Sequence, residues 1–404
     1  MTGRKDGQQL TTTTKKRSRE VKLKLKTNDL RVWMGRLTKL SRAGNQQPIL
    51  DTVRLEADEE GHLTLDFTNG DLWMKAQFAC DISIGGSCLV NAKKLLEASK
   101  LLQDSEVSME LSPRGLKVSG RSAVYTFSSM SASEFHSEPA MVPEDGALKV
   151  EVAGRFLEGM IKGVQESISS DESRYLLRSL KLEVEGSLVR MVATDGRRLS
   201  IYERDLKELG ASVLSEGKEG GALIPADAVS VIRDLAADAD GEVVKLLADH
   251  RALNFWWDNA WLKVNLVEGK FPTYRAVIPD FSSRPAITIS PDEWSDAISS
   301  VLAIAVTTGK DKTPKLVISK DSFKLEEPEV GSAQVDVETP GVEDVAVNAQ
   351  FLRDAIKSIP TAKAVYYPGA PMDPLVLTLP DHGPSNPIRW THVLMPIRTS
   401  GGGK

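Results

Sequence analysis

The sequence predicts an α+β protein built from three similar units, each with two helices and antiparallel sheets. The first observation behind this prediction is a pattern of strand, turn and helix that recurs along the chain in two series of three segments. The second is that stretches of alternating apolar and polar residues, separated by turn residues, follow the helices. Amphipathic helices pack on one face of such sheets, which gives an α+β layer.

The composition is that of a globular protein with several domains. A chain of 404 residues exceeds what one hydrophobic core organises, so we expect about two to four domains. Hydrophobic residues make up 41% and charged residues 26%. No apolar run reaches the roughly 20 residues that span a bilayer, and the N-terminal stretch has no apolar segment of a secretory signal. We therefore expect a cytoplasmic protein.

The first series of segments opens each unit with a short alternating strand, a turn and a helix. Its members are LKLKTNDLRVWMGRLTKLSR (23–42), LKVEVAGRFLEGMIKGVQES (148–167) and ITISPDEWSDAISSVLAIA (287–305). In the second member the apolar side chains fall on one helical face, as in an amphipathic helix. These residues are Phe156, Leu157, Met160, Ile161 and Val164.

The second series repeats an apolar pair, then Asn or Pro, then Ala and an amphipathic helix. Its members are LVNAKKLLEASKLL (89–102), LIPADAVSVIRDLA (223–236) and AVNAQFLRDAIKSI (346–359). Two modules in each of three units predict three domains, which we place at residues 21–145, 146–280 and 281–398.

Two alternating stretches, at residues 53–78 and 179–204, read as antiparallel hairpins and resemble each other. Thr-Asn-Gly-Asp-Leu at 68–72 in the first corresponds to Thr-Asp-Gly-Arg-Arg-Leu at 194–199 in the second. The second of these turns is short and charged and ends in a leucine, so it is a candidate for function.

Positive charge is concentrated on the helices although the net charge of the chain is −5. A net negative charge argues against a general basic coat for nucleic acid, yet lysine and arginine recur opposite the apolar stripes of the helices. A solvated helix face is the alternative explanation. The fifth helix, in PDEWSDAISSVL, carries acids instead.

Residues 1–20 are predicted to form a disordered basic tail, because they are rich in Thr, Gln, Lys and Arg and poor in apolar residues. Such a tail is either a solvated leader or an auxiliary arm that contacts DNA.

Motifs of common enzymes are absent from the sequence. It contains no GxxxxGK[ST], GxGxxG, GxSxG or HExxH pattern. The five histidines are scattered singly, and Cys80 and Cys88 lack the spacing of a metal site. We predict no catalytic residue, no metal and no cofactor, although carboxylate pairs that meet only in the fold stay open.

Three segments together carry a resemblance to a known family. ATDGRRLS (193–200), EGKFPTYRAVIP (268–279) and THVLMPIR (391–398) resemble, in this order, motifs of the β subunit of bacterial DNA polymerase III, the β sliding clamp family. The resemblance covers about residues 21 to 398, and the threefold repeat matches the three-domain architecture of that family.

The resemblance implies a ring-shaped homodimer whose helices line a central channel and whose sheets form the outer wall. Such a ring is a non-catalytic processivity factor that holds double-stranded DNA through phosphate contacts, without sequence specificity. Loop 42–47, which often carries an arginine in clamps, has Gly44-Asn45-Gln46-Gln47 here. The DNA-binding residues implied are Arg31, Arg36, Lys39, Arg42, Lys93, Lys100, Arg155, Lys162, Arg233, Arg353 and Lys357.

The family also implies a groove that binds short peptide motifs of the replicative polymerase, the clamp loader and repair proteins. Arg197 stands where the family usually has His, Ala276 where it has a second Arg, and Ser179 where Gly is common, and these changes affect which peptides bind. The matching groove residues are Arg174, Tyr175, Leu177, Thr194, Gly196, Arg198, Leu199, Pro272, Val277, Val393, Met395, Pro396 and Arg398.

The dimer contact implied by the family joins edge strands of the first and third domains beside a small apolar patch. Tyr125, Phe127, Leu302 and Ile304 occupy similar places, with plain core packing as the alternative. Residues 399–404 extend past the usual end as a flexible tail. The alternative function is a clamp-fold paralogue that serves as a protein-binding scaffold outside replication.

Overall fold

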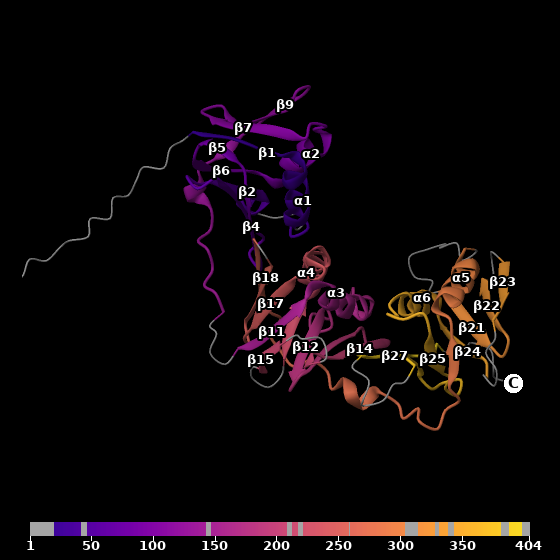
Figure 1. Ribbon diagram of the computed structural model, residues 1–404. Helices are drawn as coiled ribbons and strands as arrows, with labels where there is room; N and C mark the ends of the chain where they lie inside the picture. The colour runs from indigo at the N-terminus through magenta and orange to yellow at the C-terminus, as the bar shows by residue number, and fades with distance from the viewer. Residues whose placement is uncertain are drawn as a thin grey trace, which may run out of the picture. The chain divides into compact units, whose positions relative to one another are not determined.

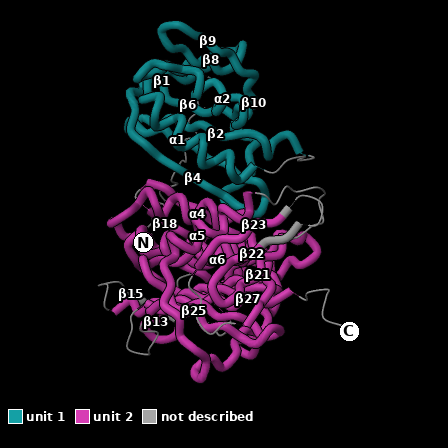
Figure 2. Tube along the Cα trace, turned by 90° about the vertical axis from the view of Figure 1, so that its right-hand side faces the viewer, with its two compact units in different colours: residues 1–139 teal, residues 140–404 magenta. Residues whose placement is uncertain are grey.

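The computed structural model describes residues 20–41, 47–142, 147–207, 212–216, 221–257, 259–303, 314–327, 331–337, 343–380 and 388–397. The chain divides into two compact units, residues 1–139 and residues 140–404 (Figures 1 and 2). All strand pairings described below are antiparallel.

Unit 1 contains two sets of strands and a pair of packed helices. One sheet has the order β5-β1-β7-β8-β9, and a second set of strands has the order β10-β6-β2-β3-β4. Helices α1 (Thr27–Thr38) and α2 (Ala92–Leu101) pack against each other. The strands are β1 (Val21–Lys26), β2 (Thr52–Ala57), β3 (His62–Thr68), β4 (Leu72–Ala79), β5 (Asp81–Ile84), β6 (Gly86–Asn91), β7 (Glu106–Ser112), β8 (Gly115–Ser119), β9 (Val124–Phe127) and β10 (Ser129–Met130).

Unit 2 contains a set of strands in the order β19-β18-β17-β11-β15 and a four-stranded sheet in the order β23-β22-β21-β24. The helix pair α3 (Gly154–Lys162) and α4 (Ala226–Ala239) belongs to its first half, and the pair α5 (Pro291–Leu302) and α6 (Ala349–Lys357) to its second (Figure 1). The strands are β11 (Leu148–Ala153), β15 (Ser212–Glu216), β17 (Val243–Ala248), β18 (Ala252–Trp257), β19 (Ala260–Asn265), β21 (Lys315–Ser319), β22 (Ser322–Glu327), β23 (Gly331–Asp336) and β24 (Val345–Asn348).

An eight-stranded sheet joins the two halves of unit 2. Its order is β16-β12-β13-β14-β27-β26-β25-β20, so that β14 lies beside β27 although the two strands are far apart in the sequence. The strands are β12 (Ser179–Glu185), β13 (Leu188–Thr194), β14 (Arg198–Asp205), β16 (Ala222–Pro225), β20 (Ile287–Ile289), β25 (Ala364–Tyr367), β26 (Leu375–Thr378) and β27 (Ile388–Leu394).

The predicted α+β architecture is confirmed, including the strand and helix of every repeat segment and the hairpins at 53–78 and 179–204. The helix pairs α1–α2, α3–α4 and α5–α6 recur once in each predicted domain. The boundaries of the three domains stay a prediction, because the continuous sheet through β14 and β27 keeps residues 140–404 together as one unit.

Gly154 shows how closely the helices of a pair approach. It opens α3, and a Cβ at this position would lie 2.2 Å from the carbonyl oxygen of Ala236 and 2.7 Å from Cβ of Ala239, both in α4. These distances are well below van der Waals contact. Only glycine fits at this crossing of α3 and α4 without a shift of the backbone.

Candidate functional site

The turn between β13 and β14 is built by its own side chains. The carboxylate of Asp195 accepts hydrogen bonds from the backbone N–H groups of Arg197 (2.8 Å) and Arg198 (3.0 Å). Thr194 Oγ1 donates to the carbonyl of Arg198 (2.6 Å) and accepts from the N–H of Gly196 (3.1 Å). Gly196 has φ of +84°, a left-handed conformation that glycine adopts without a steric penalty. The sequence Thr-Asp-Gly therefore fixes the shape of the turn.

Strand β27 lies directly beside β14, the strand that follows this turn. Leu199 pairs with Val393 across the two strands, and both side chains are only 3% exposed. Just past β27, the N–H of Met395 donates to the carbonyl of Arg197 (2.9 Å). Two of the predicted groove motifs, from residues 193–200 and 391–398, are thus neighbours in the sheet.

The third motif packs on the same apolar cluster. Phe271 and Tyr274 belong to the buried cluster that contains Leu199 and Val393. Tyr274 starts the short 3₁₀ helix η5 (Tyr274–Val277), and its hydroxyl donates to Glu183 Oε2 of β12 (2.7 Å). Burial, followed by this hydrogen bond to Glu183, raises the pKa of Tyr274 to about 12. The hydroxyl therefore stays protonated and holds η5 against the sheet.

Large apolar side chains that are close in sequence to members of this cluster remain exposed. Tyr175, Val277 and Met395 are exposed to 60%, 58% and 45%. Pro272 is exposed and Pro396 half-buried. Exposed apolar groups beside a buried apolar cluster are what a docking surface for apolar side chains requires.

The segment before β12 adds to the cluster a side chain that the sequence analysis did not single out. Leu176 packs against the buried apolar cluster, next to Leu177, whose place in the groove stays a prediction. Leu177 is half-buried, and its carbonyl accepts the N–H of Ser169. Spacing along the sequence could not distinguish two adjacent leucines in an irregular segment.

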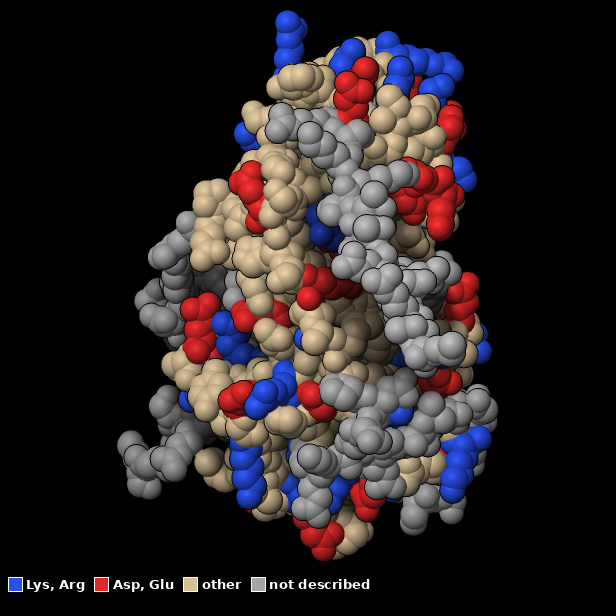
Figure 3. Space-filling view, turned by 90° about the vertical axis from the view of Figure 1, so that its left-hand side faces the viewer, with Lys and Arg blue, Asp and Glu red and all other residues tan. Residues whose placement is uncertain are grey.

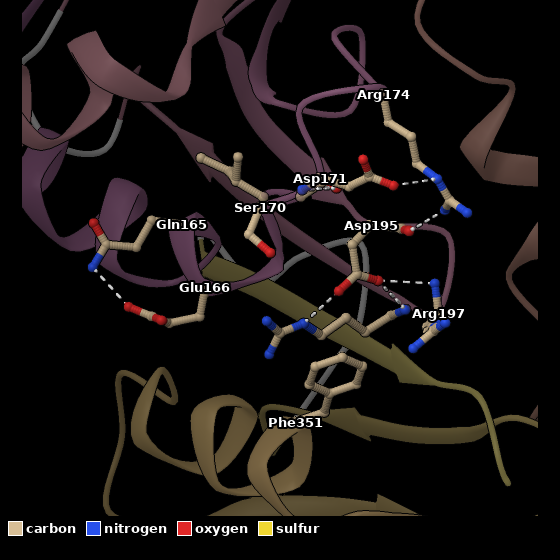
Figure 4. Close-up of a pocket in the computed structure, with 11 residues that line it drawn as sticks. Gln165, Glu166, Ser170, Asp171, Arg174, Asp195, Arg197 and Phe351 are labelled. Atoms are coloured by element: carbon tan, nitrogen blue, oxygen red, sulfur yellow. Dashed lines mark hydrogen bonds and ion pairs between the residues drawn. The ribbon is translucent and has the colours of Figure 1, made fainter. Parts of the chain in front are cut away.

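A cavity of about 400 Å³ lies beside the turn, between residues 165–174 and helix α6 (Figure 4). The walls are mainly polar and include charges of both signs. The lining residues that the sequence analysis did not single out for this site come from the segment after α3 and from α6. They include Gln165, Glu166, Asp171 and Phe351.

Arg198 connects the turn to α6. Its Nε lies 3.0 Å from Asp195 Oδ2, and its Nη1 lies 3.0 Å from Asp354 Oδ2 of α6. The guanidinium also covers the ring of Phe351, with its central carbon 4.1 Å from the ring centroid. The residue is only 9% exposed. Arg198 was predicted as a groove residue, and the structure places it within the wall, as a link between the two halves of unit 2.

The cations predicted to bind DNA fall into two groups among the described residues. Arg31 donates to the carbonyls of Ser99 and Leu102 at the end of α2, and Arg233 and Arg353 also donate to side chains of the protein. Arg36 covers the ring of Trp33 at 4.3 Å. The remaining side chains are exposed: Lys39, Lys93, Lys100, Arg155, Lys162 and Lys357.

Charged side chains of both signs are visible in small groups among uncharged areas on the face shown in Figure 3. This fits the mixed charge of the sequence. Several predicted positions lie outside the described residues: Arg42, Arg398, Ile304, the tail at residues 1–19 and residues 399–404.

Two of the predicted dimer residues lie on the last strand of a sheet. Tyr125 and Phe127 are half-buried members of β9, which ends the order β5-β1-β7-β8-β9 among the described strands. Leu302 is the half-buried last residue of α5.

Other titratable side chains of note lie outside this site. Asp58, Glu60 and His62 lie close enough together to hold a metal ion on the turn between β2 and β3. Burial raises the pKa of the Cys80 thiol to about 11 and that of Cys88 to about 12, so both are protonated. Among the described residues, no helix is long and apolar enough to cross a membrane.

Comparisons with known proteins agree with the fold and with the motifs. The solved clamp of Caulobacter crescentus is 25% identical, with a TM-score of 0.78 and coverage of 94% of this chain and 99% of that chain. The solved β subunit from Thermotoga maritima is 22% identical, with a TM-score of 0.77 and coverage of 94% and 100%. The fold is therefore that of a DNA sliding clamp.

Sequence comparisons give the family. Residues 21–139 match the N-terminal domain of the DNA polymerase III beta subunit, and residues 151–273 match its central domain. The beta sliding clamp of Rickettsia felis is 25% identical over 397 residues, which cover 94% of this chain and 100% of the relative. The chain belongs to the DNA polymerase III β subunit family, whose members are the β sliding clamps.

Proposed function

We propose that two copies of this chain form a ring around duplex DNA and tether replication proteins to it, without catalysing a reaction. The observation that carries the proposal is the threefold recurrence of helix pairs with exposed Lys and Arg in a chain of net charge −5. Cations that touch only phosphates hold DNA without reading its sequence. Retention by the ring then requires no tight contact, and the protein can slide.

The exposed helix residues Lys93, Lys100 and Lys357 are the first candidates for phosphate contacts. Lys93 and Lys357 form no hydrogen bond or ion pair within the described structure, and Lys100 pairs only with exposed Glu97 (2.8 Å). Arg31, by contrast, is held by three hydrogen bonds to carbonyls. We propose that Arg31, Arg233 and Arg353 chiefly stabilise the helix pairs.

Peptide segments of the replicative polymerase, the clamp loader and repair proteins are proposed to dock beside the β13–β14 turn. Exposed Tyr175, Val277 and Met395 are close in sequence to members of the buried cluster that contains Leu199 and Val393. Burial of an apolar side chain contributes about 1.5–3 kcal/mol, so two anchors suffice for a reversible tether. The flexible side chain of Met395 adapts to different partners.

Closure of the ring is proposed to use β9, whose Tyr125 and Phe127 lie at the end of a sheet in unit 1. A sheet end offers unpaired backbone groups and, here, aromatic side chains to a second copy. Leu302 is a proposed member of the apolar patch of the opposing surface. Sedimentation at micromolar protein concentration tests the dimer, and a monomer would contradict it.

Retention on circular DNA tests encirclement. A bacterial clamp loader places the labelled protein on singly nicked circular DNA, which is then purified and cut once. We expect the protein to stay on circles and to leave linear molecules. Equal retention on both forms, or none, would refute encirclement and would favour a protein-binding scaffold of the clamp fold.

A charge series tests the helix contacts. Lys93→Gln, Lys100→Gln and Lys357→Gln combined should lower the slope of log affinity for DNA against log salt by about three, because each phosphate contact contributes about 0.9. The matched control removes three exposed lysines from outside the helices, Lys22, Lys117 and Lys363. An equal effect of both triple variants would show that the helix lysines act only through the overall charge of the protein and not through phosphate contacts of their own.

A further inference from the structure

The cavity beside the β13–β14 turn contains one cation that the protein itself does not use. Three arginines line it, and two are engaged: Arg174 pairs with Asp171 (3.4 Å) and donates to the carbonyl of Asp195 (3.1 Å), and Arg198 is shared between two carboxylates. Arg197 is exposed, and its guanidinium forms no hydrogen bond or ion pair with any residue in the described ranges. Arg197 is therefore available to a ligand (Figure 4).

The carboxylates of the cavity are already occupied. Asp195 accepts from two backbone N–H groups and from Arg198, and Asp171 accepts from the N–H and the hydroxyl of Ser173. Glu166 accepts from the amide of Gln165 (3.2 Å). None of these groups turns toward Arg197 to neutralise it. The lining contains three arginines and three carboxylates, and Arg197 is the arginine among them whose guanidinium has no partner in the described structure.

The backbone of Arg197 is fixed next to the apolar wall. Its N–H donates to Asp195, and its carbonyl accepts the N–H of Met395, whose side chain is exposed on the proposed docking surface. An extended peptide advances about 3.3 Å per residue. Because Met395 and Arg197 are joined by a backbone hydrogen bond, we expect a side chain one or two positions from an apolar anchor at Met395 to meet the guanidinium.

We propose that the cavity receives an acidic side chain of the docked peptide and that Arg197 is its partner. The inference rests on the proposed peptide-binding function and adds to it a preference for motifs with Asp or Glu beside the apolar residues. A single carboxylate fits better than a nucleic-acid strand, because consecutive phosphates would also face Glu166 and Asp171 at the cavity wall. Arg197 then determines specificity, while apolar contacts provide most of the affinity.

Peptide binding to the full-length protein tests this inference. Fluorescein-labelled peptides of Gln, Leu and Phe carry one Glu, which is moved through the positions flanking the apolar residues, and each has a counterpart with Gln in its place. Fluorescence anisotropy gives the dissociation constants. At one or two positions we expect Glu to bind about fivefold tighter than Gln, the upper range for an exposed ion pair, with a smaller ratio at high salt.

Three variants show whether Arg197 causes the preference. Arg197→Gln should reduce the ratio of the affinities for the Glu and the Gln peptides to about one. Arg197→Lys should keep part of the preference for Glu. Arg114→Gln is the matched control, because it removes an exposed arginine from the β7–β8 turn of unit 1. This control should leave the ratio unchanged.

The outcomes separate the inference from the proposed groove. Peptides that bind with no preference for Glu at any position, or a preference that persists in Arg197→Gln, would overturn the inference and leave the groove intact. No binding of any peptide would overturn both. A short single-stranded oligonucleotide that displaces the peptide from the wild type but not from Arg197→Gln would show that the cavity takes phosphate, which also overturns the inference.

Discussion

Replacement of Arg198 by methionine tests whether this residue holds the two halves of unit 2 together. The wild-type guanidinium makes two hydrogen bonds of 3.0 Å to Asp195 and Asp354 while only 9% exposed. A hydrogen bond to a charged group contributes about 1.5–3 kcal/mol. Both carboxylates keep other donors, since Asp354 also accepts from Gln350 Nε2 (2.6 Å). We therefore expect a net loss of about 2–4 kcal/mol for Arg198→Met.

Hydrogen exchange measured by mass spectrometry reports this loss locally, which matters because a chain of several domains does not unfold in two states. Peptides covering 194–202 and 349–357 should exchange faster by about 30-fold to several hundred-fold, since each 1.36 kcal/mol gives a factor of ten. Arg197→Met is the matched control, because the guanidinium of the neighbouring arginine has no partner in the described structure. Unchanged protection in α6 of Arg198→Met would refute the role of Arg198 as a link.

Three further predictions concern the packing around the site. Glu183→Gln should weaken the attachment of η5 to the sheet, because the hydrogen bond from Tyr274 loses its charged acceptor. We expect the affinity for peptides, measured by fluorescence anisotropy, to fall by about three- to tenfold. Tyr274→Phe should give a similar loss. Gly154→Ala should destabilise the α3–α4 pair by about 2–4 kcal/mol, since its Cβ would lie 2.2 Å from a carbonyl oxygen of α4, and hydrogen exchange of peptides covering 154–162 and 226–239 measures this loss. Gly159→Ala, where the Cβ meets no atom within 4 Å, should not destabilise the same helix. Burial lowers the pKa of His392 to about 3, from 6.5, so the unfolded chain binds a proton that the folded protein excludes. Stability should therefore fall as the pH decreases below about 6.5, by up to about 1.4 kcal/mol per pH unit, and thermal unfolding of His392→Phe should lose this dependence.

Much of the fold could be predicted because the chain repeats itself. The helical periodicity of apolar residues identifies each helix, and the alternation of apolar and polar residues identifies each hairpin. Because the pattern recurs three times, every segment can be checked against two others. The pairing of β14 with β27 could not be predicted from local pattern, since it joins strands separated by most of unit 2. Shared sequence motifs suggested that the segments meet, without saying how.

The site was only partly predictable for a related reason. Phe351 was assigned to the apolar face of its helix, and the structure places its ring under Arg198 at the cavity. The spacing of apolar residues predicts which face of a helix is buried, but it does not predict which residues from elsewhere in the chain pack beside that face. Asp354 carried no signal at all, because a carboxylate on a helix is ordinarily solvated, and its partner comes from the other half of the unit.

The β13–β14 turn has a counterpart in unit 1, and a comparison of the two distinguishes the residues that shape the turn from those that give it a further role. There Thr68 bonds to the turn in the same way as Thr194, and the Asn69 side chain accepts two backbone N–H groups as Asp195 does. The amide of Asn69 additionally donates to a backbone carbonyl just after α1 (2.7 Å), whereas the carboxylate of Asp195 holds Arg198. The Thr-Asx-Gly motif is thus a device for making the turn. Two differences give the turns their separate roles: Asp195 replaces the amide of Asn69, and Arg198 stands at the position of Leu72, so that the second turn joins the two halves of unit 2 through Asp354.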